Sequence, residues 1–441
     1  MRTRALAGLV LALLALSPAP ASAQSDTALE PFREAVALYQ AGRYEEAEPL
    51  MKEALRRSER EFGPDNPGAA AVRTSLANLY RQQGRYAEAE PLFRRALAAY
   101  EKAFGPDHPN LGLALDGLAV LHTAQGRFSE AEPLFRRALA MRENALGPEH
   151  PDVAITLNNL AELYREQGRR GEAEPLYRRA LAIDERALGQ DHPSTAAVLS
   201  NLALLYLDER RHAEAEQLLR RALAITARVR GEDHPEVATS LTNLAELYRE
   251  QGRHDEAERL YQRALAIDER ALGQDHPATA TILNDLASLY AAQGRHAEAE
   301  PLFRRALAIR EKVLGPDHPY VATTLGNLGG LYLTLGRHAE TEPLLERALV
   351  IREKALGPEH PDVAQSLNNL AIVYRRQGRY SEAESLYRKA LASMEKTLGP
   401  DHPSTATVLK NLAKLYREQG RDAEADALRQ GASSIERQPS R

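Results

Sequence analysis

Aspartate and histidine stand side by side between glycine and proline at regular intervals along this chain. In the stretch LGPDHP, at residues 314–319 and again at 398–403, Asp and His lie between two prolines, and Gly precedes the first of them. Both Asp and His serve as metal ligands and as proton-transfer groups. Such a pair can therefore belong to a metal site, to a catalytic centre or to a turn, and the surrounding elements must decide among these.

Four further histidines each precede a glutamate by four residues, a spacing that places both side chains on one helix face: His212 with Glu216, His254 with Glu258, His296 with Glu300, and His338 with Glu342. One imidazole and one carboxylate are too few ligands for tight metal binding. The chain has no cysteine, and it carries no Walker loop, G-x-S-x-G, H-E-x-x-H or EF-hand motif. We therefore expect no enzyme activity, cofactor or metal site, and interpret these pairs as exposed pairs at helix starts.

The glycines of the Asp-His-Pro stretches define a repeat of 42 residues without insertion or gap. Each is followed two residues later by Asp or Glu and four residues later by Pro: Gly63, Gly105, Gly147, Gly189, Gly231, Gly273, Gly315, Gly357 and Gly399. Nine copies in phase predict a repeat architecture, in place of the two or three compact domains that 441 residues would suggest.

Each repeat is predicted to be a hairpin of two helices. Residues 151–168 place Leu157, Leu160 and Tyr164 at helical spacing, and residues 170–188 show the same periodicity. The chain is rich in Ala, Leu, Glu and Arg, with 5% aromatic residues and no Trp, which favours helices over strands. The fold class expected is an all-α solenoid.

The LGPDHP stretch then becomes the joint between hairpins. Gly315 follows a second helix and is free to take a positive φ. Pro319 starts the next helix, where its missing N–H costs nothing, and Asp317 is expected to help cap that helix. The Asp-His pair is thus interpreted as turn chemistry.

The repeat pattern L-x2-L-A-x2-Y…A-x3-[YF]-x2-A resembles that of the tetratricopeptide repeat. The phrasing LNNLAELYREQGR…EAEPLYRRALAI…LGxDHP is similar to the repeats of kinesin light chain, from residue 63 to about 429. The resemblance implies a right-handed superhelix of helix hairpins whose first helices line a concave, peptide-binding face. It does not imply a motor role, because the heptad coiled coil that joins a light chain to its motor is absent.

The two ends are expected to differ from the repeats. Residues 1–23 are predicted to be a signal peptide, with a positive start, twelve apolar residues at 5–16 and Ala21-Ser22-Ala23 at the cleavage site. The mature chain would begin at Gln24 and act in the periplasm or the medium. We expect a divergent N-terminal capping repeat over 24–62, nine repeats over 63–431 and a disordered tail over 432–441.

Charge and composition exclude some partners. The net charge is −5 with both signs interspersed, and no basic stripe indicates nucleic acid. No other apolar segment approaches the length of a membrane span. After cleavage of the signal peptide, we expect no stable membrane insertion and no nucleic-acid partner.

Projection of a first helix at about 100° per residue places one row of asparagines opposite the apolar stripe: Asn159, Asn201, Asn243, Asn327, Asn369 and Asn411. A carboxamide both donates and accepts, so it can hold a peptide backbone, and the resemblance implies this role. The alternative is an amide ladder that ties adjacent helices together.

The same arc carries Arg165, Arg249 and Arg375, and Leu204 and Leu207 lie between two of these arginines in the sequence. Arginine suits carboxylates with bidentate geometry, although Arg165 can simply pair with Glu162 three residues earlier. These residues predict a ligand that is acidic with an apolar anchor, as the resemblance to kinesin light chain also implies. The exposed leucines can equally be ordinary surface residues.

The function expected is a non-catalytic scaffold that binds extended peptide segments of other proteins, with one peptide crossing Asn201, Leu204, Asn243 and Arg249. The alternative is a structural or self-assembling solenoid without a dedicated peptide ligand.

Overall fold

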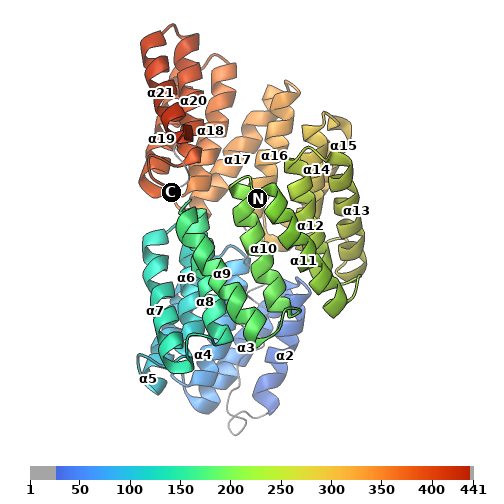
Figure 1. Ribbon diagram of the computed structural model, residues 1–441, viewed down its shortest axis with the longest axis vertical. Coiled ribbons are helices and arrows are strands. Elements are labelled where there is room, and N and C mark those ends of the chain that lie inside the picture. The colour runs from blue at the N-terminus through green and yellow to red at the C-terminus, as the bar shows by residue number, and fades with distance from the viewer. Residues whose placement is uncertain (1–25, 438–441) are drawn as a thin grey trace. The chain divides into compact units, whose positions relative to one another are not determined.

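Helix hairpins follow one another through the described part of the chain (Figure 1). The structure is a computed structural model that describes residues 26–437, and within that range it contains twenty helices and no strand. The all-α solenoid of repeated hairpins is therefore confirmed. The predicted signal peptide, residues 1–23, lies outside the described residues.

The first helices of the hairpins are α2 (Asp26–Gln40), α4 (Pro67–Gln82), α6 (Leu111–Ala124), α8 (Pro151–Glu166), α10 (Pro193–Asp208), α12 (Pro235–Glu250), α14 (Pro277–Ala292), α16 (Pro319–Thr334), α18 (Pro361–Arg376) and α20 (Pro403–Glu418). The second helices are α3 (Tyr44–Phe62), α5 (Tyr86–Phe104), α7 (Phe128–Leu146), α9 (Arg170–Ala187), α11 (His212–Arg230), α13 (His254–Ala271), α15 (His296–Leu314), α17 (His338–Leu356), α19 (Tyr380–Thr397) and α21 (Asp422–Arg437).

The described residues divide into two compact units, one with residues 26–123 and 127–289 and the other with residues 124–126 and 290–437. Within each unit, a first helix packs on the second helix of its own hairpin and on that of the hairpin before, as α8 does with α9 and α7. Consecutive first helices also contact each other, as α8, α10 and α12 do in the first unit and α18 and α20 in the second.

Small residues let the two helices of a hairpin approach closely. Ala161 of α8 and Ala173 and Ala180 of α9 are completely buried, and the larger Leu157 and Tyr177 fill the space between them. Burying a side chain such as Leu157 contributes roughly 1.5–3 kcal/mol. The apolar stripes read from the sequence are therefore the core of each hairpin.

The Gly-Asp-His-Pro joint has the geometry of a helix end followed by a helix start. Gly315 has φ 87°, and His318 is extended, with ψ 140°, directly before Pro319. The cap of α16 is His318, whose Nδ1 accepts the Tyr320 N–H at 3.0 Å. The prediction that Asp317 caps this helix is wrong, because the Asp317 carboxylate pairs with Lys354.

Histidine caps the other first helices of the later repeats in the same way, through His150, His192, His234, His276, His360 and His402. Each imidazole accepts a backbone N–H that has no partner within its helix. Within residues 26–437, no group of three or more His, Asp or Glu side chains could hold a metal ion. The histidines of these joints have a structural role.

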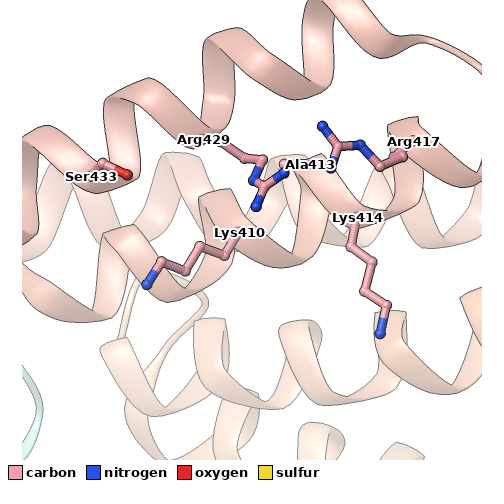
Figure 2. Close-up of a pocket in the computed structure, with 6 residues that line it drawn as sticks. All are labelled: Lys410, Ala413, Lys414, Arg417, Arg429 and Ser433. Atoms are coloured by element: carbon pink, nitrogen blue, oxygen red, sulfur yellow. The ribbon is translucent and has the colours of Figure 1, made fainter.

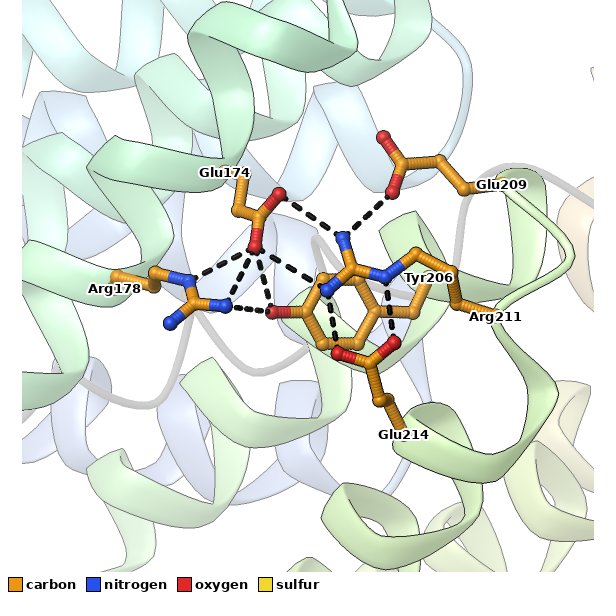
Figure 3. A network of polar contacts seen from close by, with 6 residues as sticks. All are labelled: Glu174, Arg178, Tyr206, Glu209, Arg211 and Glu214. Carbon is orange, nitrogen blue, oxygen red and sulfur yellow. Dashed lines mark hydrogen bonds and ion pairs between the residues drawn. The ribbon is translucent and has the colours of Figure 1, made fainter.

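From the second hairpin onward, an arginine at the start of the second helix joins its hairpin to the one before. The Arg211 guanidinium lies 3.7 Å from the centre of the Tyr206 ring and donates to Glu174 at 3.0 Å, Glu209 at 2.9 Å and Glu214 at 2.5 Å. The Tyr206 hydroxyl also donates to Glu174 at 2.9 Å. We call Arg211, Tyr206 and Glu174, shown in Figure 3, and their equivalents the arginine clasp.

The clasp recurs because its residues recur at fixed spacing. In each case the arginine bonds a glutamate 37 residues earlier, in the preceding hairpin: Arg85 with Glu48, Arg169 with Glu132, Arg253 with Glu216, Arg337 with Glu300, Arg379 with Glu342, and Arg421 with Glu384. Glu216, which we expected to pair with His212, therefore belongs to the clasp, and it also accepts from Arg220.

The C-terminal helix is longer than the sequence indicated. We expected the repeats to end near residue 431 and a disordered tail to follow, but α21 continues to Arg437. Ala425, Leu428, Ala432 and Ile435 maintain helical spacing on its inner side. Within residues 26–437, every helix is too short or too polar to cross a membrane.

Candidate functional site

The asparagine row lies between consecutive first helices. Asn159, Asn201 and Asn243 are buried, with exposed fractions of 4%, 5% and 7%, and Asn327, Asn369 and Asn411 are half-buried. The row is therefore less open than a groove lining requires, and three of its members have little contact with solvent.

Two of these asparagines bond the helix before them. The Asn201 Nδ2 donates to the Asn158 Oδ1 at 2.9 Å, and the Asn411 Nδ2 donates to the Asn368 Oδ1 at 2.9 Å. Both bonds run from one first helix to the preceding first helix, as an amide ladder would. The donating carboxamide retains a second N–H and its own oxygen. It therefore has enough hydrogen-bonding groups to bond the neighbouring helix and a peptide backbone at the same time.

The arginine row is matched by carboxylates of the chain itself. Arg165, only 9% exposed, bonds Glu162 at 2.6 Å and 2.9 Å and Asp208 of the next first helix at 2.7 Å. Burial alone would lower the pKa of the Arg165 guanidinium, but the charges of Glu162 and Asp208 hold this pKa well above its ordinary value. Arg165 is therefore a fixed cation inside a network.

The other two arginines of the row also have carboxylate partners. Arg249 bonds Glu246 at 2.5 Å and 2.8 Å, and Arg375 bonds Glu418 of the following first helix. An acidic ligand at any of these positions must share the guanidinium with a carboxylate that is already in place.

A buried tyrosine completes the Glu–Arg network, and sequence reasoning missed its role. The Tyr177 hydroxyl donates to Glu162 at 2.7 Å, and the Tyr261 hydroxyl donates to Glu246 at 3.0 Å. The signal was present in the repeats: where the Glu162 position carries Asn78, Val120 or Ser288, the Tyr177 position carries Phe93, Phe135 or Phe303. Tyrosine appears in both repeats that place glutamate there, and also at Tyr387, where the Glu162 position carries Ile372.

Only one of the two leucines predicted to hold an apolar anchor is accessible. Leu207 is buried, with 6% of its surface exposed, whereas Leu204 is half-buried. Leu204 alone of this pair remains within reach of a ligand.

Three adjacent first helices nevertheless present a continuous row of accessible side chains, which we call the first-helix face. It consists of Ile155, Asn158 and Glu166 of α8, Ala197, Ser200, Leu204 and Asp208 of α10, and Thr239, Glu246, Arg249 and Glu250 of α12. Amide, hydroxyl and carboxylate groups alternate here with small apolar surfaces. Such a face can accept and donate hydrogen bonds and shelter one aliphatic side chain.

Comparison with protein families decides what these hairpins are. The profile of the tetratricopeptide repeat matches nine overlapping stretches that together extend from residue 29 to 430: 29–102, 73–144, 130–186, 152–227, 194–270, 241–312, 278–342, 321–396 and 362–430. The chain belongs to the tetratricopeptide repeat family. Tetratricopeptide repeats are generally non-catalytic scaffolds for interactions between proteins.

Solved tetratricopeptide structures are similar to parts of this chain. A putative kinesin light chain from Podosopora anserina with nearly identical TPR-like repeats is 32% identical, over 46% of this chain and 96% of that one, with a TM-score of 0.40. BtubC (BKLC) from P. vanneervenii is 27% identical, over 54% of this chain and 92% of that one, with a TM-score of 0.41.

A further similarity extends over most of the repeat array. A Rap protein, solved in complex with competence and sporulation factor, is 17% identical over 85% of this chain and 99% of its own, with a TM-score of 0.56. At this identity the similarity concerns the fold. A search of curated proteins finds no match to this tetratricopeptide repeat chain.

Proposed function

We propose that this chain is a non-catalytic scaffold that binds extended peptide segments of other proteins along its first-helix face. One observation carries the proposal: α8, α10 and α12 contact one another in sequence, so their accessible polar side chains form one row. The Rap protein, whose fold is similar, was solved with competence and sporulation factor bound.

The proposed peptide crosses Asn201, Leu204, Asn243 and Arg249. The tie from Asn201 to Asn158 fixes the distance between two first helices, and the more accessible amide of Asn158 and hydroxyl of Ser200 beside it can meet a peptide backbone. Half-buried Leu204 provides the apolar contact. A ligand carboxylate would approach Arg249, where Glu246 already bonds the guanidinium, so the preference for an acidic residue should be modest.

Selection of displayed extended peptides on the full chain tests this function. An enriched peptide is then measured against Asn243→Ala with Arg249→Ala, against Leu204→Gln, and against the control pair Arg95→Ala with Lys389→Ala. Arg95 and Lys389 are exposed residues of second helices. We expect binding about tenfold weaker for the first two variants, which is about 1.4 kcal/mol, and unchanged binding for the control.

Circular dichroism must show that each variant remains folded. Equal binding by all variants would refute the placement on the first-helix face. If no peptide is enriched and light scattering shows oligomers that grow with concentration, the self-assembling solenoid is the better description.

We also propose that the chain is exported and that its mature form begins at Gln24. The support is the order of charged, apolar and small residues over 1–23. Intact mass spectrometry of the protein recovered from periplasm and medium tests this, and recovery of only the uncleaved chain in the cytoplasm would contradict it.

A further inference from the structure

The last helix hairpin, α20–α21, differs from earlier hairpins on the face that they turn toward their successor. In the hairpin before it, the completely buried Tyr387 belongs to an apolar cluster that includes Val408 and Leu412 of the following first helix. The residue of α21 that stands 42 positions after Tyr387 is Arg429, and it is exposed. Lys410 likewise stands at the position of Asn368, which accepts a bond from the next first helix.

A pocket of about 560 Å³ opens on this face, lined by Lys410, Ala413, Lys414, Arg417, Arg429 and Ser433. Figure 2 shows the lysines and Arg417 along α20, and Arg429 and Ser433 on α21. The Arg417 and Arg429 side chains extend toward the same space near Ala413. The volume lies within the range of pockets that hold small ligands or parts of larger ones.

The pocket concentrates positive charge. Lys410, Lys414 and Arg417 follow one another at spacings of four and three residues along one side of α20, where like charges repel. Arg417 bonds Asp426 at 2.8 Å. Among the side chains described in residues 30–435, Lys414 and Arg429 have no ion pair. Clustered cations in a concavity attract anions.

Two earlier contacts between consecutive first helices show which chemical group binds the arginine at this position. Arg165 bonds the Asp208 carboxylate of the next first helix at 2.7 Å, and Arg375 pairs in the same way with Glu418. Arg417 occupies the equivalent position in the last repeat. At these two interior joints, therefore, a carboxylate at the end of the next first helix meets the arginine of this face.

A second copy of the chain is poorly suited to cover the pocket through its own first helix. Where α10 and α20 carry Asn201 and Asn411, α2 carries Arg33, which would face Lys410 in the register of the interior joints. At the position of Asp208, α2 carries the uncharged Gln40. Head-to-tail stacking would thus bring cation to cation and supply no carboxylate.

We infer that the α20–α21 pocket binds an acidic segment of a partner protein, which approaches as the first helix of a further repeat would. Carboxylates of that segment meet Lys414 and Arg429, and one more can share Arg417 with Asp426. This pocket is separate in residues from the first-helix face proposed above, and either can be wrong without the other.

A pair of labelled helical peptides of about 16 residues, the length of α20, tests the inference. One alternates Glu with Ala and Leu, and the other has Gln at every Glu. Fluorescence anisotropy measures their binding to the full chain, to Lys414→Glu with Arg429→Glu, and to the control Arg95→Glu with Lys389→Glu. The control makes the same change in net charge at exposed residues that have no ion pair among the described side chains.

We expect the Glu peptide to bind the full chain and the control with affinities within about twofold, and to bind the pocket variant at least about tenfold more weakly. The Gln peptide should bind much more weakly throughout. Equal binding of the Glu peptide to both variants would overturn the inference, as would equal binding of both peptides. Vesicles rich in anionic lipid that bind where the Glu peptide does not would identify a membrane, and would likewise overturn it.

The two proposals fail separately. Asn243→Ala with Arg249→Ala should bind the Glu peptide as the unaltered chain does, because neither residue lines the α20–α21 pocket. If this variant lost the Glu peptide while the pocket variant kept it, the acidic segment would belong to the first-helix face.

Discussion

Replacing Asp184 by asparagine should stabilise the chain most at neutral pH and least in acid. Asp184 lies in α9 with 1% of its surface exposed. Its carboxylate accepts the Ser194 hydroxyl at 2.6 Å, and its Oδ1 has no hydrogen-bond partner among the described residues. Burial raises the pKa of this carboxyl from 3.8 to about 6, while the bond from Ser194 acts in the opposite direction.

The magnitude follows from the shift in pKa. A carboxyl whose pKa rises by about 2 units on folding costs the folded state about 3 kcal/mol once it is ionised. The folded state holds its proton more tightly than the unfolded state, so the stability is fully present below pH 3.8 and is lost as the pH rises to about 6. The carboxamide that replaces this carboxyl in the variant does not titrate.

Urea unfolding at about pH 4 and at about pH 7.5 measures this effect, with hydrogen exchange of α9 as a local readout because repeat arrays can open locally. From the lower to the higher pH, the free energy of unfolding of the variant should rise by up to about 3 kcal/mol relative to that of the unaltered chain. Any pH-independent effect of the carboxamide cancels in this comparison. Asp107→Asn, at an exposed joint residue, should show no such change. A difference between variant and unaltered chain that is the same at both pH values would refute the reasoning.

Two further predictions concern the repeat itself. Tyr177→Phe removes the hydroxyl that bonds buried Glu162 at 2.7 Å, and denaturant unfolding should show a loss of about 1–2 kcal/mol; unchanged stability would show that Glu162 needs no third partner. Gly315→Ala should lose about 1 kcal/mol because φ is 87° there, whereas Gly326→Ala, inside α16 with equally open surroundings, should gain about 0.5–1 kcal/mol. Thermal melts that show the same sign for both glycine variants would contradict this.

The hairpins could be predicted from the sequence because their signals are local. Gly315 and Pro319 mark a helix end and a helix start within five residues, and the spacing of Leu157, Leu160 and Tyr164 marks the buried side of a helix. These features depend on backbone preferences and periodicity. The sequence predicted Asp317 as the cap of α16, but His318 caps this helix. Such a choice between neighbouring side chains depends on the geometry of the turn, which local sequence signals do not give.

The partners of the candidate site could not be predicted in the same way. Arg165 meets Asp208, 43 residues away, because two first helices pack in one particular register. A single-helix projection treats this arc of α8 as exposed to solvent, although Asn159 is buried once the helices pack together. The pairing of Tyr177 with Glu162 leaves only a partial signal in the variation among repeats, because Tyr387 occurs with Ile372 at the glutamate position.

The arginine clasp has a consequence for how such a chain can change its length. The interior hairpins carry both the arginine that bonds the hairpin before and the glutamate that accepts from the hairpin after, as Arg211 and Glu174 illustrate. Recombination that inserts or deletes a whole number of 42-residue segments therefore keeps each donor opposite an acceptor at every new junction. The recurrence of NLAELYREQGR at 159–169 and 243–253 fits such an event. Whole repeats can therefore be added or removed without any change to the residues that join neighbouring hairpins, so the number of repeats can vary easily.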